Sequence, residues 1–238
     1  MIKFEHPEVW GWEHAIRGMR NPMNSWERSD SKFDCTSSRS ENCPGDCGEW
    51  CTGYDYVLGQ NDYDLMARLI KGGQPHRKFL RQIFVSVDIT APLYWWKEFD
   101  TYKVGTTANS CSTMHKIQAK EFALEDFSHE HLFDGVIQRE GRDMEEYENP
   151  TRCLEYVIGV LNFYRDKYNE TKDKHYWWQM IQLLPSSYNQ KRTVTMTYEN
   201  LLNMLEYRRG HKLDEWRQFC EWIFTLPNSH ILREGIEE

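Results

Sequence analysis

The sequence has no long apolar run. None of its segments approaches the roughly 20 consecutive apolar residues that a membrane-spanning helix needs. Residues 1–6 lead straight into polar sequence, without the apolar core of a secretory signal peptide. We therefore expect a cytoplasmic protein that does not enter a membrane. Internal repeats and a second hydrophobic core are also absent, so residues 1–238 are expected to form a single domain.

An excess of basic residues is missing as well. The chain has 29 Lys and Arg against 37 Asp and Glu, which gives a formal net charge of -8. Proteins that bind a nucleic-acid backbone depend on clustered positive charge, because they neutralise phosphates. The composition therefore argues against nucleic acid as a partner. It favours a small molecule or another protein.

A disulfide framework is not expected, because the number of cysteines is odd, at seven, and the expected compartment is reducing. Four cysteines, Cys35, Cys43, Cys47 and Cys51, lie within a loop-like insertion at about residues 30–59 that is rich in Ser, Asp and Gly. Four thiolates can complete a tetrahedral, structural zinc site. Free or oxidisable thiols are the alternative, and the sequence leaves both open.

Aromatic residues are abundant: they make up 14% of the chain, and ten of them are Trp. The adjacent Trp95 and Trp96 could stack on a flat ligand, although neighbouring Trp residues more often pack in a core. Abundant aromatic residues are also typical of subunit contacts.

The hydrophobic pattern predicts an α+β fold. Ile83, Val85, Val87 and Ile89 recur at every second position, which is typical of a half-buried strand. The expected strands are 79–93 and 193–197; the expected helices are 13–20, 64–70 (capped by Asn61 or Asp62), 94–100, 125–138, 151–168, 175–184 and 200–224, the last interrupted near Gly210.

Three segments, taken in order, carry a resemblance. A turn with His76 and Phe79 leads into a strand that ends in Ala91-Pro92, and a polar segment follows directly. Further along come Leu184-Pro185 and then a helix that carries Asn203 and Arg208. This arrangement resembles the flavin-dependent thymidylate synthase (ThyX) family. The resemblance covers most of the chain apart from the cysteine-rich insertion.

The resemblance implies an α+β fold with a mixed sheet flanked by helices, and a homotetramer whose active sites form between subunits. It also implies FAD as the cofactor and a uridine-type nucleotide such as dUMP as the substrate. The residues implied are Arg208 as the catalytic residue that holds the base, His76, Tyr102, Lys103, Asn109 and Asn203 at the flavin, and Ser112, Thr113, His115 and Arg209 at the substrate.

The polar segment departs from the family pattern where the family has its Arg-His-Arg signature. Thr101-Tyr102-Lys103 stands there, Met114 replaces a second Arg, and Ile181 replaces an Arg before the Leu-Pro pair. Each lost charged contact costs about 1.5 to 3 kcal/mol of binding. Affinity for dUMP should therefore fall strongly unless Lys103, Arg192 or Arg209 compensates.

Two hypotheses follow. One is an enzyme that uses flavin on a uridine-type nucleotide, which the retained Asn203 and Arg208 favour. The other is a non-catalytic relative that binds a nucleotide-like signal or a protein, for instance in conflict between a phage and its host. The loss of the Arg-His-Arg signature favours the second.

Overall fold

The computed structural model describes residues 2–35, 54–135, 138–139, 141–143 and 149–236. Contacts group the chain into two compact units. Unit 1 comprises Met1–Lys3, Asp88–Thr101 and Ala108–Thr193, and unit 2 comprises Phe4–Val87, Tyr102–Thr107 and Val194–Glu238. The expectation of a single domain stays a prediction, and each unit is described by itself below.

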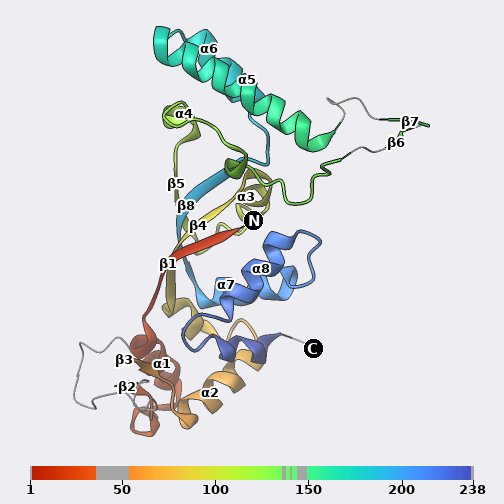
Figure 1. Ribbon diagram of the computed structural model, residues 1–238. Coiled ribbons are helices and arrows are strands. Elements are labelled where there is room, and N and C mark those ends of the chain that lie inside the picture. The colour runs from red at the N-terminus through yellow and green to blue at the C-terminus, as the bar shows by residue number, and fades with distance from the viewer. Residues whose placement is uncertain (1, 36–53, 136–137, 140, 144–148, 237–238) are drawn as a thin grey trace. The chain divides into compact units, whose positions relative to one another are not determined.

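The chain forms a four-stranded sheet (Figure 1). Its strands are β1 (Lys3–Trp10), β4 (Phe84–Pro92), β8 (Asn189–Thr197) and β5 (Thr107–Ser110), and their order in the sheet is β1-β4-β8-β5. Together with the helices, this sheet confirms the predicted α+β class.

The period-two pattern of β4 is confirmed by burial. Ile83, just before the strand, and Ile89 are fully buried, and Val85 and Val87 are at most 1% exposed. The residues between them face a less buried side, so the alternation in sequence becomes an alternation of faces.

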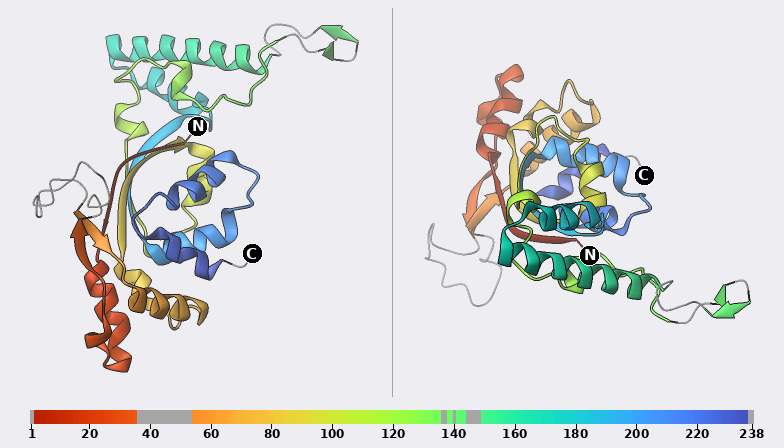
Figure 2. Two further views of the ribbon diagram at one scale, coloured as in Figure 1. Left: turned by 60° about the horizontal axis from the view of Figure 1, so that its bottom comes forward. Right: turned by 90° about the horizontal axis from the view of Figure 1, so that it is seen from above.

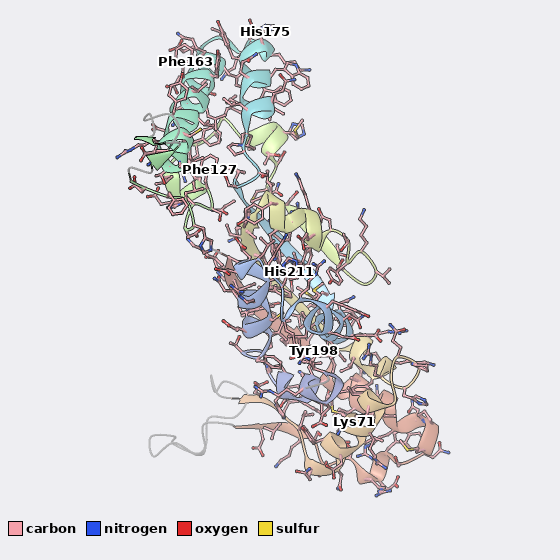
Figure 3. All side chains as sticks on the ribbon, turned by 90° about the vertical axis from the view of Figure 1, so that its right-hand side faces the viewer. Lys71, Phe127, Phe163, His175, Tyr198 and His211 are labelled. Atoms are coloured by element: carbon pink, nitrogen blue, oxygen red, sulfur yellow. The ribbon has the colours of Figure 1, made fainter. Side chains whose placement is uncertain are left out.

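The described residues of unit 2 form four α-helices and a hairpin. The helices are α1 (Trp12–Arg20), α2 (Gln60–Lys71), α7 (Tyr198–Arg208) and α8 (Asp214–Ile223), and the hairpin pairs β2 (Lys32–Cys35) with β3 (Tyr54–Val57). Two 3-10 helices, η5 (Lys78–Gln82) and η8 (Ser229–Gly235), pack against α1 and α2 respectively. The Tyr198 ring, labelled in Figure 3, is fully buried, and its hydroxyl donates to the carbonyl of Pro227.

Unit 1 is built on two long helices that lie side by side, α5 (Pro150–Thr171) and α6 (Lys174–Leu183) (Figure 2). The Asn149 side chain caps α5 by accepting hydrogen bonds from the backbone of Thr151 and Arg152. Shorter elements are α3 (Leu93–Phe99), α4 (Thr113–Lys116), η6 (Leu124–Asp126) and the hairpin of β6 (Gln138–Arg139) with β7 (Arg142–Asp143). The core joins Ile117, Phe122, Phe127, Leu154, Ile158, Leu161 and Met180.

Three expectations from the sequence were wrong. Strand β1 was missed because most of its residues are exposed and show no apolar alternation. The described residues 127–135 do not form the helix expected at 125–138, because the chain leaves helical geometry at Phe127, which forms an isolated bridge with Tyr188. Helix α2 is capped by Gly59 rather than by Asn61 or Asp62.

Trp95 and Trp96 belong to the core. Both rings are at most 1% exposed, and the indole nitrogen of Trp96 donates to the carbonyl of Gln190 at 2.9 Å. The alternative role, stacking on a flat ligand, does not fit this burial.

Asp62 is fully buried and holds several segments of unit 2 together. Its carboxylate accepts hydrogen bonds from Arg20 Nε at 2.6 Å, from the Ser29 hydroxyl at 2.8 Å, and from the hydroxyl of Ser31 at 2.6 Å. The backbone N–H groups of Asp30 and Ser31 also donate to it. This carboxylate therefore ties α1, α2 and the segment before β2 to one another.

Replacing Asp62 by Asn should lower the free energy of unfolding by about 3 kcal/mol or more, because it leaves the buried Arg20 without its counter-charge. Urea unfolding of Asp62→Asn measures this. The matched control is Asp64→Asn, an exposed carboxylate on the same helix, which should change stability by less than about 0.5 kcal/mol. Equal losses in both variants would contradict this role for Asp62.

The same carboxylate predicts a pH dependence. Burial alone raises the pKa of Asp62, but the hydrogen bonds from Ser31, Ser29 and Arg20 outweigh burial and hold the pKa below its usual value. A lowered folded-state pKa adds stability above the unfolded pKa of about 3.9, and this stability is lost as pH falls through the folded value. The difference in unfolding free energy between wild type and Asp62→Asn should therefore be constant near neutral pH and shrink in acid. A difference that grows in acid would contradict the sign.

Candidate functional site

The start of α7 is fixed by reciprocal hydrogen bonds. The Thr197 hydroxyl accepts from the backbone N–H of Asn200, and the Asn200 side-chain oxygen accepts from the backbone N–H of Thr197 at 3.0 Å. The Asn200 amide nitrogen also donates to the carbonyl of Val104 at 2.7 Å. Asn200 therefore anchors the 102–107 segment to the helix.

This anchoring brings Tyr102 to the far end of α7, where it meets Arg208. Arg208 Nε donates to the Tyr102 hydroxyl at 2.9 Å. The guanidinium carbon lies 4.8 Å from the ring centre of Trp216 and 5.6 Å from that of Tyr102. The two rings meet edge to face, and Trp216 is fully buried. Arg208 is thus held between two aromatic rings while remaining half-buried.

One helical turn separates two further polar residues on α7, Glu199 and Asn203. Arg77 Nη2 donates to Asn203 Oδ1 at 2.9 Å, and Arg77 Nε lies 3.7 Å from Glu199 Oε1. Arg81 pairs with both oxygens of Glu199. Arg77 is 7% exposed, and its Nε has no hydrogen-bond partner among the described residues. The result is an ordered cluster of two arginines, a carboxylate and an amide.

His76, next to Arg77 in sequence, lines a cavity of about 480 Å3. A Cβ on Gly72 would stand 3.1 Å from His76 Cδ2, so glycine lets the imidazole lie close to the end of α2. The lining residues are Gly18, Met19, Asn21, Pro22, Met23, Leu69, Pro75, His76, Lys78, Phe79 and Gln82.

The predicted site residues fall in both units. Unit 2 holds His76, Tyr102, Lys103, Asn203, Arg208 and Arg209; unit 1 holds Asn109, Ser112, Thr113 and His115. Within unit 2, Tyr102 contacts Arg208, and Asn203 contacts Arg77 beside His76. Arg209 lines a different cavity, together with residues of α8 and η8.

In unit 1, Ser112 has a local structural role. Its hydroxyl accepts the backbone N–H of His115 at 3.0 Å and so caps the short helix α4, which begins at Thr113. Asn109 lies on β5, whose residues are all exposed.

The positions where the ThyX pattern has arginine serve other purposes. The Thr101 hydroxyl donates to the carbonyl of Glu98 at the end of α3. Ile181 packs against the hydrophobic core of unit 1. The Met114 side chain is 48% exposed.

Sequence reasoning missed Arg77, Glu199 and Trp216. A signal existed for the first two: Arg77 adjoins His76, and Glu199 lies four residues before Asn203, hence on the same helical face. Trp216 gave no signal beyond the general excess of aromatic residues.

The structure does not test the zinc hypothesis. Within the described ranges, no group of three or more His, Cys, Asp or Glu side chains could hold a metal ion. Cys35 ends β2 opposite Tyr54, whereas Cys43, Cys47 and Cys51 lie outside the described residues.

Of the helices in the described part of the chain, none is both long and apolar enough to cross a bilayer.

Comparison with known proteins identifies the fold. Flavin-dependent thymidylate synthase ThyX from Helicobacter pylori, solved with FAD and dUMP, aligns over 99% of both chains with a TM-score of 0.61 and 15% identity. A second structure of that enzyme with the same ligands gives the same score and identity, over 100% of this chain and 99% of the other. The UMP/dUMP methylase PolB from Streptomyces cacaoi, bound with 5-Br dUMP, aligns over 99% of this chain and 96% of its own, with a TM-score of 0.56 and 12% identity.

No protein-family model and no curated protein match the sequence. The chain therefore has a ThyX-like fold with a strongly diverged sequence.

Glu199 should be needed to keep Arg77 buried. Among the described residues, Glu199 is the only carboxylate in contact with this arginine, so we expect Glu199→Gln to lose about 3 kcal/mol in unfolding free energy. Chemical denaturation measures the unfolding free energy of Glu199→Gln and of the control Glu206→Gln, which changes an exposed Glu on the same helix. Equal stability of the two variants would refute the pairing.

Proposed function

We propose that the protein binds a uridine-type nucleotide beside a flavin, with Arg208 as the guanidinium that contacts the pyrimidine. The observation that carries this proposal is the aromatic surroundings of Arg208, whose Nε donates to the Tyr102 hydroxyl and whose guanidinium carbon lies 4.8 Å from the ring centre of Trp216. These contacts hold the guanidinium in a defined place, and a guanidinium suits hydrogen bonding to polar ligand atoms.

The fold supports the choice of ligand. The two Helicobacter structures hold FAD and dUMP, and the Streptomyces protein is a UMP/dUMP methylase. In the ThyX family, which the sequence resembles, the Arg that corresponds to Arg208 holds the uracil base and favours its nucleophilic form. A fixed cation can do this because it stabilises negative charge that develops on the ring.

Flavin is the cofactor that the resemblance implies, and the surroundings of His76 are compatible with part of it. The cavity there, of about 480 Å3, has Met19, Pro75 and Phe79 as apolar walls and Lys78 as a cation. Flat rings favour such walls, and a cation suits phosphate. His76 and Lys78 would hold the cofactor in this cavity, and the resemblance implies Asn203 as a further contact. The cofactor, when bound, would supply reducing equivalents.

A second candidate is binding without methyl transfer. It is favoured by Thr101 and Ile181, which stand where the family has arginines. Thr101 hydrogen-bonds at the end of helix α3, and Ile181 packs against the hydrophobic core of unit 1. In this reading Arg208 still holds a nucleotide, but the chemistry that depends on the missing arginines is lost. An assay for dTMP with dUMP, reduced flavin and a folate methylene donor separates the two: turnover supports the enzyme, and binding without turnover supports the second candidate.

Calorimetric titration with dUMP tests the proposal. Wild type should bind dUMP, and Arg208→Ala should weaken binding at least about tenfold, because one charge-assisted contact is worth 1.5 kcal/mol or more. Tyr102→Phe keeps the ring but removes the hydroxyl that orients Arg208, and a loss of about fivefold is expected.

The matched control for this titration is Arg68→Ala, an exposed arginine of unit 2 that contacts none of these residues in the described structure. It should leave the affinity for dUMP unchanged. If Arg208→Ala bound dUMP as tightly as wild type does, Arg208 would not be the nucleotide contact.

A further inference from the structure

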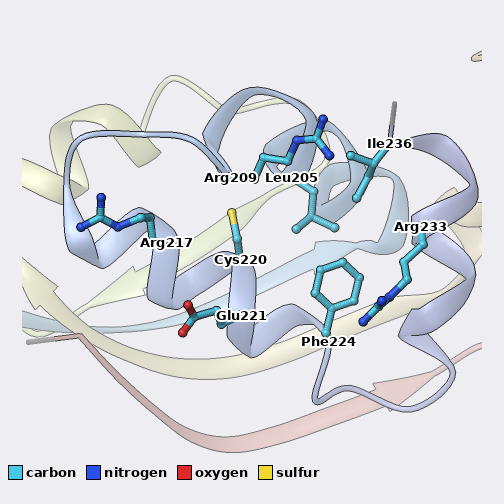
Figure 4. A pocket seen from close by; sticks show the side chains of 8 residues that line it. All are labelled: Leu205, Arg209, Arg217, Cys220, Glu221, Phe224, Arg233 and Ile236. Atoms are coloured by element: carbon cyan, nitrogen blue, oxygen red, sulfur yellow. The ribbon is translucent and has the colours of Figure 1, made fainter. Parts of the chain in front are cut away.

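A second cavity lies in unit 2, between α7, α8 and η8, with a volume of about 470 Å3 (Figure 4). The lining residues are Leu205, Arg209, Arg217, Cys220, Glu221, Phe224, Arg233 and Ile236. None of them belongs to the clusters around Arg208 and Arg77. Its size falls within the range of cavities that hold small organic molecules, roughly 300 to 1,000 Å3.

The middle of the cavity is apolar. Leu205, Cys220, Phe224 and Ile236 gather there in Figure 4, and Leu205 and Cys220 are at most 5% exposed. Burial raises the pKa of the Cys220 thiol to about 11, with a smaller contribution from Glu221, so the thiol is neutral at physiological pH. The apolar atoms of a ligand would leave water when they pack against this part of the cavity, which favours binding. This part of the cavity offers no charged group to the ligand.

The edge of the cavity is cationic. Arg209, Arg217 and Arg233 stand around the apolar residues in Figure 4, and all three are exposed. Glu221 is the one carboxylate among the eight lining residues, and Asp214 pairs with Arg217 beside them, so the three arginines exceed these two carboxylates by one charge. The whole chain carries -8. The net positive charge around this cavity is therefore opposite in sign to the net charge of the whole chain and does not follow from the overall composition.

Two of these arginines contact neighbouring side chains that help to position them. Arg217 pairs with Asp214 one turn earlier on α8. The Arg233 guanidinium lies 4.8 Å from the ring centre of Phe224. A guanidinium packed over a ring keeps its N–H donors directed outward in its own plane, which is the direction from which an anion approaches.

We propose that this cavity binds a small amphipathic anion, meaning a carboxylate, sulfonate or phosphate carried on an apolar body. The apolar body packs on Leu205, Cys220 and Phe224, and the anionic group faces the arginines. A nucleotide fits poorly, because its polar sugar and base would lose hydrogen bonds to water against this surface. The site is separate from the proposed nucleotide site and does not depend on it.

Fluorescence titration with anilinonaphthalene sulfonate, an aromatic anion that becomes bright in apolar surroundings, tests the proposal. Phenylnaphthylamine has the same apolar body without the charge and serves as the matched probe. The folded wild-type protein should bind the sulfonate saturably, and at least about tenfold more tightly than the neutral probe, because only the sulfonate uses the arginines.

The decisive variant is Arg217→Gln/Arg233→Gln, which removes two charges at exposed positions and should leave the fold intact. It should weaken sulfonate binding about tenfold or more while changing phenylnaphthylamine affinity less than about twofold. Arg28→Gln, an equal change of charge per site at an exposed residue elsewhere in unit 2, should affect neither probe. Equal sulfonate affinity in the double variant and wild type, or no saturable binding to wild type, would overturn the proposal.

Discussion

The geometry of the candidate site depends on how the first turn of α7 is fixed. Asn200 caps the helix together with Thr197, and its amide also holds the carbonyl of Val104. Because one side chain joins the helix to the 102–107 segment, Tyr102 has a defined place beside Arg208. Gly105 makes this approach possible: it has a positive φ, and a Cβ there would stand 2.9 Å from the Asn200 side-chain oxygen.

The side chains of helix α7 make different kinds of contact along the helix. Glu199 and Asn203, one turn apart, meet the arginines that follow His76. Arg208, at the end of the helix, lies between Tyr102 and Trp216, whereas Leu205 and Arg209 line the cationic cavity. Charged and polar contacts therefore gather along α7 although Thr101-Tyr102-Lys103 stands where the ThyX pattern has Arg-His-Arg. Arg208 contacts aromatic rings, and Glu199 and Asn203 contact the arginines Arg77 and Arg81.

Much of the fold could be predicted from sequence, because burial on β4 and on α5 follows simple periods. Strand β1 could not, since an exposed strand has no apolar alternation and depends on pairing with a distant strand. In the site, Arg208 and Asn203 could be found through resemblance, and Tyr102 through its place in the altered signature. Arg77 adjoins His76 in sequence, but its contacts with Asn203 and Glu199 could not be found, because these partners are more than 100 residues away and only the folded chain brings them together.

The most direct test of the account is the visible absorbance spectrum of freshly purified protein, followed by titration with FAD in the absence and presence of dUMP. The account predicts that flavin is bound or taken up and that dUMP perturbs the flavin band, because the proposed function has the nucleotide bound beside the flavin. A protein that takes up no flavin under either condition would contradict the proposed site and leave a ThyX-like fold used for some other kind of binding.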